Sequence, residues 1–371
     1  MKKSKNILWC SSCLNMSTRP RISFNQEGVC NACIWANKKK QINWDKRNKE
    51  FLKLVKETRK NKKSEFDVIV PVSGGKDGSY VTYQLKEKYG LKPLAVTVHP
   101  PLRTELGYKN LENFKNKDFD LLEINLPYEN LKKINKFSFI DHGKPLNGWT
   151  VGIFSAVARV ADKFGINLII YGEDGEVEYG GTTHQEKLFS FSIDYLKNVY
   201  LVGKHNQILK ECLKSKEERY WWTFPDPKKS KVKMTHWSNF EDWDPYQHYV
   251  VAKTYCGYED KSERNVGTYT NFAQNDTYLM GLHYYLMYLK FGFGRTTQDV
   301  GIDIRRGAMS RGQAVRLVEI YSNEYPEKDL EKCREYFEMT KNNFNKVLDK
   351  FANKDLFIKK NNYWVPKFKI K

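Results

Sequence analysis

Residues 67–79 read DVIVPVSGGKDGS, and this stretch decides the fold. Residues 67–72 are a mostly apolar run typical of a buried strand, and residues 80–89 carry helical spacing that ends at Gly90, a suitable left-handed cap. A glycine-rich turn between strand and helix can aim backbone N–H groups at an anion, and the helix dipole adds favourable potential. The stretch therefore predicts a phosphate-binding loop. An ordinary glycine turn is the alternative.

Strand-like and helix-like segments continue to alternate after this loop. We expect further strands at residues 94–98, 120–124 and 167–171, and helices near residues 106–115 and 149–164. Parallel strands joined by helical crossovers predict an α/β fold, a doubly wound and mostly parallel sheet whose ligands bind at the carboxyl ends of the strands. The site should therefore lie just after Val72, Val98 and Tyr171.

The turn itself reads Ser73-Gly74-Gly75-Lys76-Asp77-Gly78-Ser79. Neither the common P-loop pattern nor the dinucleotide fingerprint fits these residues. Lys76 and the backbone donors suit electrostatic stabilisation of phosphate, and Asp77 is the best candidate ligand for Mg²⁺.

A second candidate loop, residues 172–181, reads GEDGEVEYGG and follows the strand expected at residues 167–171. Four acidic side chains crowded after a buried strand favour Mg²⁺ or an ammonium-derived nucleophile, although a solvated acidic turn is the alternative. Glu173 lies nearest the strand end and is our catalytic candidate here.

Four of the seven cysteines form two pairs, Cys10-x-x-Cys13 and Cys30-x-x-Cys33. Each pair presents two thiolates to one ion, so this spacing predicts a structural Zn²⁺ site with four cysteine ligands. A pair of disulfides is the alternative, and a cytosolic setting disfavours it. The remaining cysteines, Cys212, Cys256 and Cys333, stand alone, and a lone intracellular cysteine is more often a small buried apolar residue than a nucleophile.

The net charge is +19, from 63 basic and 44 acidic residues. Residues 36–63 hold twelve basic side chains, which suit a solvated helical linker or, alternatively, a nucleic-acid contact surface. No apolar run is long enough to span a bilayer, and only Ile7, Leu8 and Trp9 follow the basic first residues before Cys10. We therefore expect a cytoplasmic protein with no membrane partner.

The C-terminal half contributes arginines and aromatic residues. Arg295 follows a helix with an apolar face, Arg305 and Arg306 come shortly after, and Ser310 with Gln313 forms a capping box that starts a helix at Arg311. These four arginines suit a carboxylate or phosphate on a charged sugar, or else pair structurally with Asp299 and Asp303. The aromatic-rich residues 220–258 can stack on bases or sugars, but most such side chains pack.

The phosphate loop resembles the SGGxDS signature of the N-type ATP pyrophosphatases, which include GMP synthetase, asparagine synthetase and tRNA-thiolating enzymes. Those enzymes adenylate a substrate oxygen and release pyrophosphate. The resemblance assigns to ATP the loop residues Ser73, Gly74, Gly75, Lys76, Asp77 and Ser79, and the strand-end residues Thr97 and Gly172 by analogy with the fold. This chain departs from the signature at Gly78, where the family has serine, so Ser79 is the hydroxyl expected to replace it.

The whole arrangement is similar to the N-acetyl sugar amidotransferases of bacterial surface-polysaccharide (LPS O-antigen) and flagellin-glycan biosynthesis, which are related to the pseudaminic acid enzyme. The resemblance spans residues 8 to about 325 and rests on the cysteine pairs with GVCNAC, on INWDKR, VPVSGGKDGS and YGEDGEVEYGG, and on KFGFGRTTQDVGIDIRRGAMSR. It implies ATP-dependent conversion of a sugar acetamido group into an acetamidino group. Ammonia in that family comes from a separate glutaminase with a cyclase-like subunit, both resembling the histidine-pathway amidotransferase pair.

These observations predict four regions: a four-cysteine zinc module at residues 1–40, a basic helical linker at 41–65, an ATP pyrophosphatase domain at 66–205 and a substrate or partner region at 206–371. The expected substrate is an N-acetylated acidic or nucleotide-linked sugar, with ATP, Mg²⁺ and Zn²⁺ as cofactors. Two rivals remain: a tRNA-thiolating enzyme, which needs a catalytic cysteine near the nucleotide, and a zinc-ribbon module that binds nucleic acid without turnover.

Overall fold

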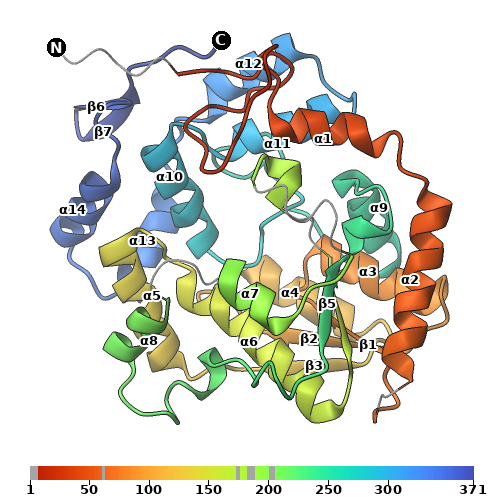
Figure 1. Ribbon diagram of the computed structural model, residues 1–371. Coiled ribbons are helices and arrows are strands. Elements are labelled where there is room, and N and C mark those ends of the chain that lie inside the picture. The colour runs from red at the N-terminus through yellow and green to blue at the C-terminus, as the bar shows by residue number, and fades with distance from the viewer. Residues whose placement is uncertain (1–6, 61–62, 173–175, 182–188, 200–204) are drawn as a thin grey trace.

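A computed structural model of the chain describes residues 7–60, 63–172, 176–181, 189–199 and 205–371 (Figure 1). Its main sheet has five parallel strands in the order β3-β2-β1-β4-β5. The strands are β1 (Val68–Pro71), β2 (Pro93–Val98), β3 (Leu121–Ile124), β4 (Leu168–Tyr171) and β5 (Lys233–His236). The expected doubly wound α/β sheet is thereby confirmed, and β5 is a strand that the apolar pattern did not predict.

The sheet is covered on both faces because successive residues of its central strands, which point to opposite faces, are mostly apolar. Ile69 and Ile169 face one core with α6 (Asn147–Phe164), which packs on the sheet beside α5 (Tyr128–His142). Val70 and Ile170 face a second core with α2 (Trp44–Arg59), α3 (Lys76–Glu87), α4 (Glu105–Lys115) and α9 (Pro245–Tyr255). Strands β1, β2 and β4 are therefore buried on both sides, which is why they read as nearly continuous apolar runs.

The helices around the sheet and in the C-terminal region follow the chain in order. They are α1 (Asn31–Lys39), α2 (Trp44–Arg59), α3 (Lys76–Glu87), α4 (Glu105–Lys115), α5 (Tyr128–His142), α6, α7 (Ile193–Val199), α8 (His205–Cys212), α9 (Pro245–Tyr255), α10 (Leu279–Phe291), α11 (Arg295–Arg305), α12 (Arg311–Tyr321), α13 (Glu327–Tyr336) and α14 (Lys341–Phe351). Short 3₁₀ turns occur at η1 (Glu176–Tyr179), η3 (Tyr220–Trp222) and η4 (Trp237–Asn239), and β6 (Phe357–Lys360) pairs with β7 (Tyr363–Pro366) in a hairpin.

The order of the strands locates the binding crevice. The strand order places β2 and β3 on one side of β1, and β4 and β5 on the other. The connections that follow β1 and β4 therefore leave towards opposite faces of the sheet. Such a switch point opens a crevice at the carboxyl ends of the strands. The loop from Ser73 follows β1 and Gly172 follows β4, as expected.

The cysteine-rich N-terminal segment lies far from the sheet, beside C-terminal helices. Figure 1 shows α1 next to α11 and α12, with the η1 turn below it. Leu14 packs with Val300, Ala314 and Val318 in a small separate core. Segments from the two ends of the chain therefore form one wall above the crevice. Within the described part of the chain, no helix is long and apolar enough to cross a membrane.

Candidate active site and metal centre

Two glycines let the phosphate loop lie close to the backbones of other elements, α4 and β1. Gly74 has a φ of +84°, and a Cβ atom there would lie 2.8 Å from the backbone nitrogen of Leu111 in α4. A Cβ on Gly78 would lie 2.7 Å from the carbonyl oxygen of Pro71. A serine at position 78 would require a shift of the β1 end, which glycine avoids.

The α3 helix begins immediately after the loop, four residues earlier than its apolar spacing predicts. Gly75 is its N-cap, in an extended conformation and without a side-chain cap. The N–H groups of a first helical turn have no partner within the helix, and here they open towards a cavity lined by Gly75 and Lys76. This arrangement can bind phosphate without further side chains.

Lys76, Asp77 and His248 form a cluster at the start of α3. Lys76 Nζ lies 2.6 and 2.7 Å from the two carboxylate oxygens of Asp77, and His248 Nδ1 lies 2.7 Å from Asp77 Oδ1. His248 comes from α9, is fully buried and stacks on Tyr80. Burial acts to raise the pKa of Asp77, but Lys76 and His248 outweigh it and lower the pKa to about 2. Asp77 is therefore a charged carboxylate at neutral pH, as a Mg²⁺ ligand must be.

A cavity of about 570 Å³ includes the phosphate loop in its lining, and its other lining residues fall into two groups by chemistry. The first group, called the apolar arm, comes from the strand ends and α6: Val96, Val98, Leu146, Trp149, Ile153, Phe154 and Tyr171. The second group, called the polar arm, is polar and aromatic: Tyr179, Tyr246, Tyr269, Tyr284, Arg295, Gln298, Asp299 and Asp303. The phosphate loop, the apolar arm and the polar arm therefore line one cavity.

Asp276 brings the C-terminal half against the phosphate loop. Its carboxylate lines the cavity and interacts with the Ser73 hydroxyl. Burial raises the pKa of Asp276 despite that hydrogen bond. A Cβ on Gly107 would lie 2.7 Å from the carbonyl oxygen of Asp276, so this glycine permits the close approach.

The four predicted arginines occupy different places. Arg295 lines the polar arm, where Nη2 donates to the Ala273 carbonyl at 2.8 Å and Nε lies 3.5 Å from Asp299. The other three lie outside the cavity walls. Arg305 donates to the Glu178 carbonyl, Arg306 pairs with Asp244 and Asp303, and Arg311 donates to the carbonyls of Cys10 and Lys371.

The remaining predicted nucleotide residues lie around the loop and not on the cavity wall. Ser79 Oγ donates to the Gly75 carbonyl within α3, at 2.8 Å. Thr97 is fully buried and, because Val96 and Val98 line the cavity, its side chain faces the other side of the sheet. A Cβ on Gly172 would lie 2.6 Å from the carbonyl carbon of Asp77, so the lack of a side chain at position 172 lets these two residues pack against each other. Glu173 lies outside the described residues.

The four paired cysteines converge at one point. Their sulfur atoms all lie within 4.8 Å of one another, with 3.9 Å between Cys10 and Cys33 and 3.7 Å between Cys13 and Cys30. All seven cysteines of the chain are free thiols, so the disulfide alternative was wrong. The pairs therefore form one cluster that could hold a metal ion, as the spacing predicts.

The dimensions of the cluster fit a single ion. A tetrahedral ion with bonds of about 2.3 Å to sulfur holds its ligands about 3.8 Å apart, close to both observed pairs. Backbone N–H groups of Cys13 and Cys30 lie 3.4 and 3.2 Å from Cys10 Sγ, and Asn15 donates to both Cys13 and Cys30. Such donors stabilise thiolates that bind a metal.

Sequence reasoning missed His248, Asp276 and Tyr179. His248 lies in the aromatic-rich residues 220–258, where most aromatic side chains do pack. Trp222 and Trp237 are buried in the cores, and of the aromatic residues in this range only Trp243, Tyr246 and Tyr258 line the cavity. Asp276 sits alone in a polar segment that no motif distinguishes. Of these three residues, only Tyr179 lies in a segment that the sequence motifs single out, the acidic loop at residues 172–181.

Three comparisons with known proteins each found a similar protein or family. Residues 266–370 match the family model of the LPS biosynthesis protein WbpG-like C-terminal domain. An uncharacterized protein of Methanocaldococcus jannaschii is 28% identical over 180 residues, which are 48% of this chain and 62% of that protein. The chain therefore spans less than two thirds of the length of this curated relative.

A solved structure of the U34-tRNA thiolase NcsA from Methanococcus maripaludis, with its [4Fe-4S] cluster, also aligns. The alignment covers 84% of this chain and 88% of the thiolase at 17% identity, but its TM-score of 0.31 is too low to support an argument. The family match is more informative because it includes Tyr269, Tyr284, Arg295 and Asp303 of the polar arm. The C-terminal region of this chain is thus similar to the WbpG-like C-terminal domain, and this match agrees with the family resemblance that the sequence motifs indicate.

Proposed function

We propose that this protein is an ATP-dependent amidotransferase that converts the N-acetyl group of a sugar into an acetamidino group. One observation carries the proposal: the phosphate loop and the polar arm of the WbpG-like domain line the same cavity. The product would enter a surface polysaccharide such as LPS O-antigen, or a flagellin glycan of the pseudaminic or legionaminic acid type.

ATP would bind with its adenine in the apolar arm and its phosphates on the loop. Lys76 is 5% exposed and held by Asp77, so it would turn from that carboxylate to the phosphates when ATP enters. Asp77 would then hold Mg²⁺, which would share the charge of the departing pyrophosphate. His248 keeps Asp77 in place throughout, because its ring is fully buried.

The chemistry requires activation because an acetamido oxygen is a poor leaving group. The carbonyl oxygen would attack the α-phosphorus of ATP, form an O–P bond and release pyrophosphate against the loop. Ammonia would then add to the carbon, lose a proton, and displace AMP with the former carbonyl oxygen, leaving the amidine. Lys76 and the backbone N–H groups would stabilise the charge on pyrophosphate. Glu173, next to Gly172 in the sequence, stays our catalytic candidate for Mg²⁺ or the ammonium-derived nucleophile, and no general base is assigned.

The sugar would occupy the polar arm. Burial, with Tyr284 and Asp77 nearby, raises the pKa of Tyr179 well above its ordinary value, so its hydroxyl stays a hydrogen-bond donor at neutral pH. Arg295 is the cation of this arm and is held rigidly by the Ala273 carbonyl. Together these groups suit an N-acetylated acidic or nucleotide-linked sugar, with Arg295 on its carboxylate.

The cysteine cluster would hold Zn²⁺ in a structural role. Its four ligands leave no open position, and its sulfur spacing suits one ion better than a four-iron cube, which must fit its own sulfides between the thiolates. Ammonia would come from a separate glutaminase with a cyclase-like subunit. We propose a cytoplasmic enzyme with no membrane or nucleic-acid partner.

The rival function, tRNA thiolation, needs a reactive cysteine at the nucleotide. The nearest lone cysteine, Cys256, lies behind α3, where its thiol donates to the Ser79 carbonyl. Burial raises the pKa of Cys256 to about 12, so it is not a thiolate at neutral pH. Among the described residues, the cavity wall includes no cysteine, which favours the sugar reaction.

The test supplies purified protein with ATP, Mg²⁺, ammonium and a panel of N-acetylated acidic and nucleotide-linked sugars. We expect AMP, pyrophosphate and a sugar lighter by about one dalton, since NH replaces O. Asp77→Asn should abolish all three, whereas Asp141→Asn, an exposed carboxylate on α5, is the matched control and should not. AMP release with tRNA, and none with any sugar, would contradict the proposal.

A further inference from the structure

One histidine lines the cavity and has no role in the reaction proposed above. Among the described residues, His283 is the only histidine on the cavity wall. It belongs to α10, within the segment that matches the WbpG-like domain. Its side chain is exposed although protein atoms surround it, as expected for a group that faces into a cavity. A ligand in the cavity can therefore reach the ring.

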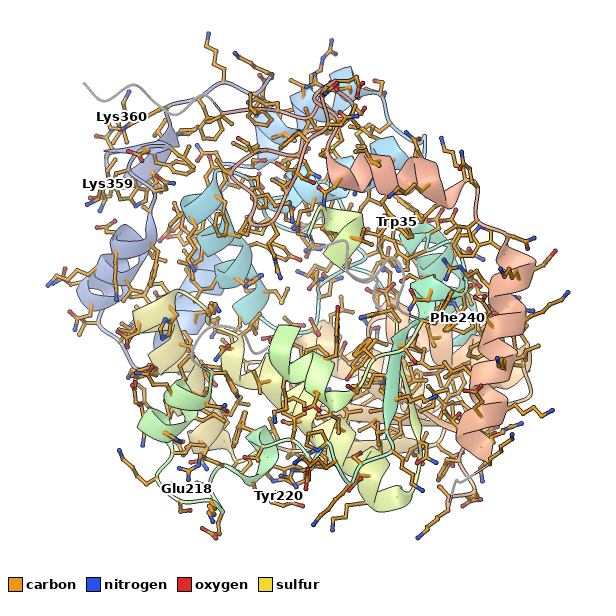
Figure 2. The ribbon with its side chains drawn as sticks, in the orientation of Figure 1. Trp35, Glu218, Tyr220, Phe240, Lys359 and Lys360 are labelled. Carbon is orange, nitrogen blue, oxygen red and sulfur yellow. The ribbon has the colours of Figure 1, made fainter. Side chains whose placement is uncertain are left out.

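The α10 helix has two different faces. Its apolar face packs towards α13, α14 and the β6–β7 hairpin, where the rings of Tyr288 and Phe357 lie 4.9 Å apart. Figure 2 shows this hairpin, marked by Lys359 and Lys360, on the outer side of α10. The opposite ridge of the helix faces the cavity, and its residues lie three or four positions apart: Met280, His283, Tyr284 and Met287.

The contacts of this ridge connect His283 to the polar arm. The His283 ring meets Tyr284 edge-on, with 5.4 Å between the ring centroids. The guanidinium of Arg295 lies over the Tyr284 ring, 5.4 Å from its centroid, and Gln298 donates to the Met287 sulfur at 3.8 Å. His283 therefore lies beside the residues that the proposed function assigns to the sugar.

The imidazole of His283 is neutral and available to a ligand. Among the described residues, none forms a hydrogen bond with its ring, whereas the ring of His248 is held by Asp77 at 2.7 Å. Burial and the positive charge of Lys290 lower the pKa of His283 to about 4, so the ring is uncharged at neutral pH. A neutral imidazole has one nitrogen that accepts a proton and one that donates.

The other acidic and basic groups of the cavity are engaged elsewhere. Its carboxylates already have partners in the described part of the chain: Asp77 with Lys76 and His248, Asp276 with Ser73, Asp299 with Thr268, and Asp303 with Tyr269. Burial raises the pKa of Tyr284 to about 12, so this hydroxyl keeps its proton at neutral pH. His283 is the uncommitted base among the described residues of the wall.

We propose that His283 is the proton carrier of the amination step, a role that rests on the proposed function. The lone pair of ammonia forms the new C–N bond, the π electrons of the adenylated group move onto the sugar nitrogen, and the added nitrogen becomes positively charged. One of its N–H protons passes to the free ring nitrogen of His283. The lone pair left behind forms the C=N bond as the C–O bond breaks.

The imidazolium then returns the same proton to the oxygen that leaves with AMP. The ring ends neutral, AMP carries the former carbonyl oxygen as a P–OH group, and the amidine remains in its protonated form. A histidine whose pKa is lowered by burial becomes a strong acid once protonated, which favours this return. No further reactant is needed.

Two half-reactions separate this role from the proposed function. Exchange of labelled pyrophosphate into ATP, dependent on an N-acetylated sugar and without ammonium, reports adenylation; amidine formed in a single turnover with ammonium reports amination. His283→Gln keeps a polar side chain that cannot carry a proton, so exchange should stay within about twofold and amination should slow at least about 100-fold. His142→Gln is the matched control because this histidine of α5 contacts Phe137 and lies outside the cavity wall; both rates should be unchanged.

A second variant tests the proton transfer itself. His283→Ala leaves space in the cavity for free imidazole, which should restore amination in this variant and not in His283→Gln. Amination at the wild-type rate in both variants, or an equal loss of exchange and amination in His283→Gln, would overturn the role of His283 and leave the proposed function standing. Absence of sugar-dependent exchange in the wild-type protein would overturn the proposed function and this role with it.

Discussion

Replacing Gly172 by alanine should both destabilise the protein and disturb the phosphate loop. The added Cβ would lie 2.6 Å from the carbonyl carbon and oxygen of Asp77 and 2.8 Å from the nitrogen of Gly78. These are backbone atoms in the first turn of α3, so they cannot swing aside as a side chain can. Overpacking of this kind costs about 1–3 kcal/mol, and the shift also moves Asp77.

Urea unfolding followed by tryptophan fluorescence measures the loss of stability, and AMP release measures the effect on the loop. Gly312→Ala is the matched control because no atom lies within 4 Å of its added Cβ, in the first turn of α12. Alanine should stabilise that helix by up to about 1 kcal/mol. If Gly172→Ala unfolds at the urea concentration of the wild type and releases AMP normally, the packing of β4 against α3 is not as described.

Three further predictions concern charge and metal. Asp77→Asn should lower the free energy of unfolding by about 2 kcal/mol at neutral pH, because the pKa of Asp77 falls from 3.8 to about 2 on folding. That stabilisation is present above the unfolded pKa and is lost as pH falls through the folded one, so the free energies of unfolding of variant and wild type should converge only towards pH ~2; a constant gap would contradict this. Arg295→Gln should raise the KM for the sugar at least about tenfold and leave that for ATP unchanged, as measured by AMP release; a matching rise for ATP would refute its place in the polar arm. Elemental analysis should find one Zn²⁺ per chain, and Cys13→Ser should lose it and unfold at lower urea; several iron atoms per chain would exclude the single-ion site.

The sheet and its phosphate loop were predictable because local sequence determines them. A strand buried on both faces must be apolar throughout, and a loop that approaches other backbones must be glycine-rich, so residues 67–79 carry both signals. Strand β5 was missed because Lys233–His236 is short and polar, and its place at the edge depends on pairing with β4.

The metal site was predictable for a similar reason, since the spacing within each cysteine pair is a local signal. The arginines were not, because their roles depend on partners far away in the chain. Arg305 and Arg306 are neighbours in sequence, yet Arg305 donates to the Glu178 carbonyl and Arg306 pairs with Asp244. His248 reaches Asp77 only because α9 packs on α3, which no local pattern reveals.

The central claim is that the acetamido oxygen becomes part of AMP. We would place oxygen-18 in the N-acetyl carbonyl group of a sugar that the enzyme converts. The labelled sugar would be supplied with ATP, Mg²⁺ and ammonium, and the mass of the released AMP measured. The proposed adenylation predicts AMP heavier by about two daltons, in step with amidine formation. If the amidine forms while AMP stays unlabelled and the label appears in water or phosphate, the oxygen leaves by another route. That result would contradict the proposed mechanism.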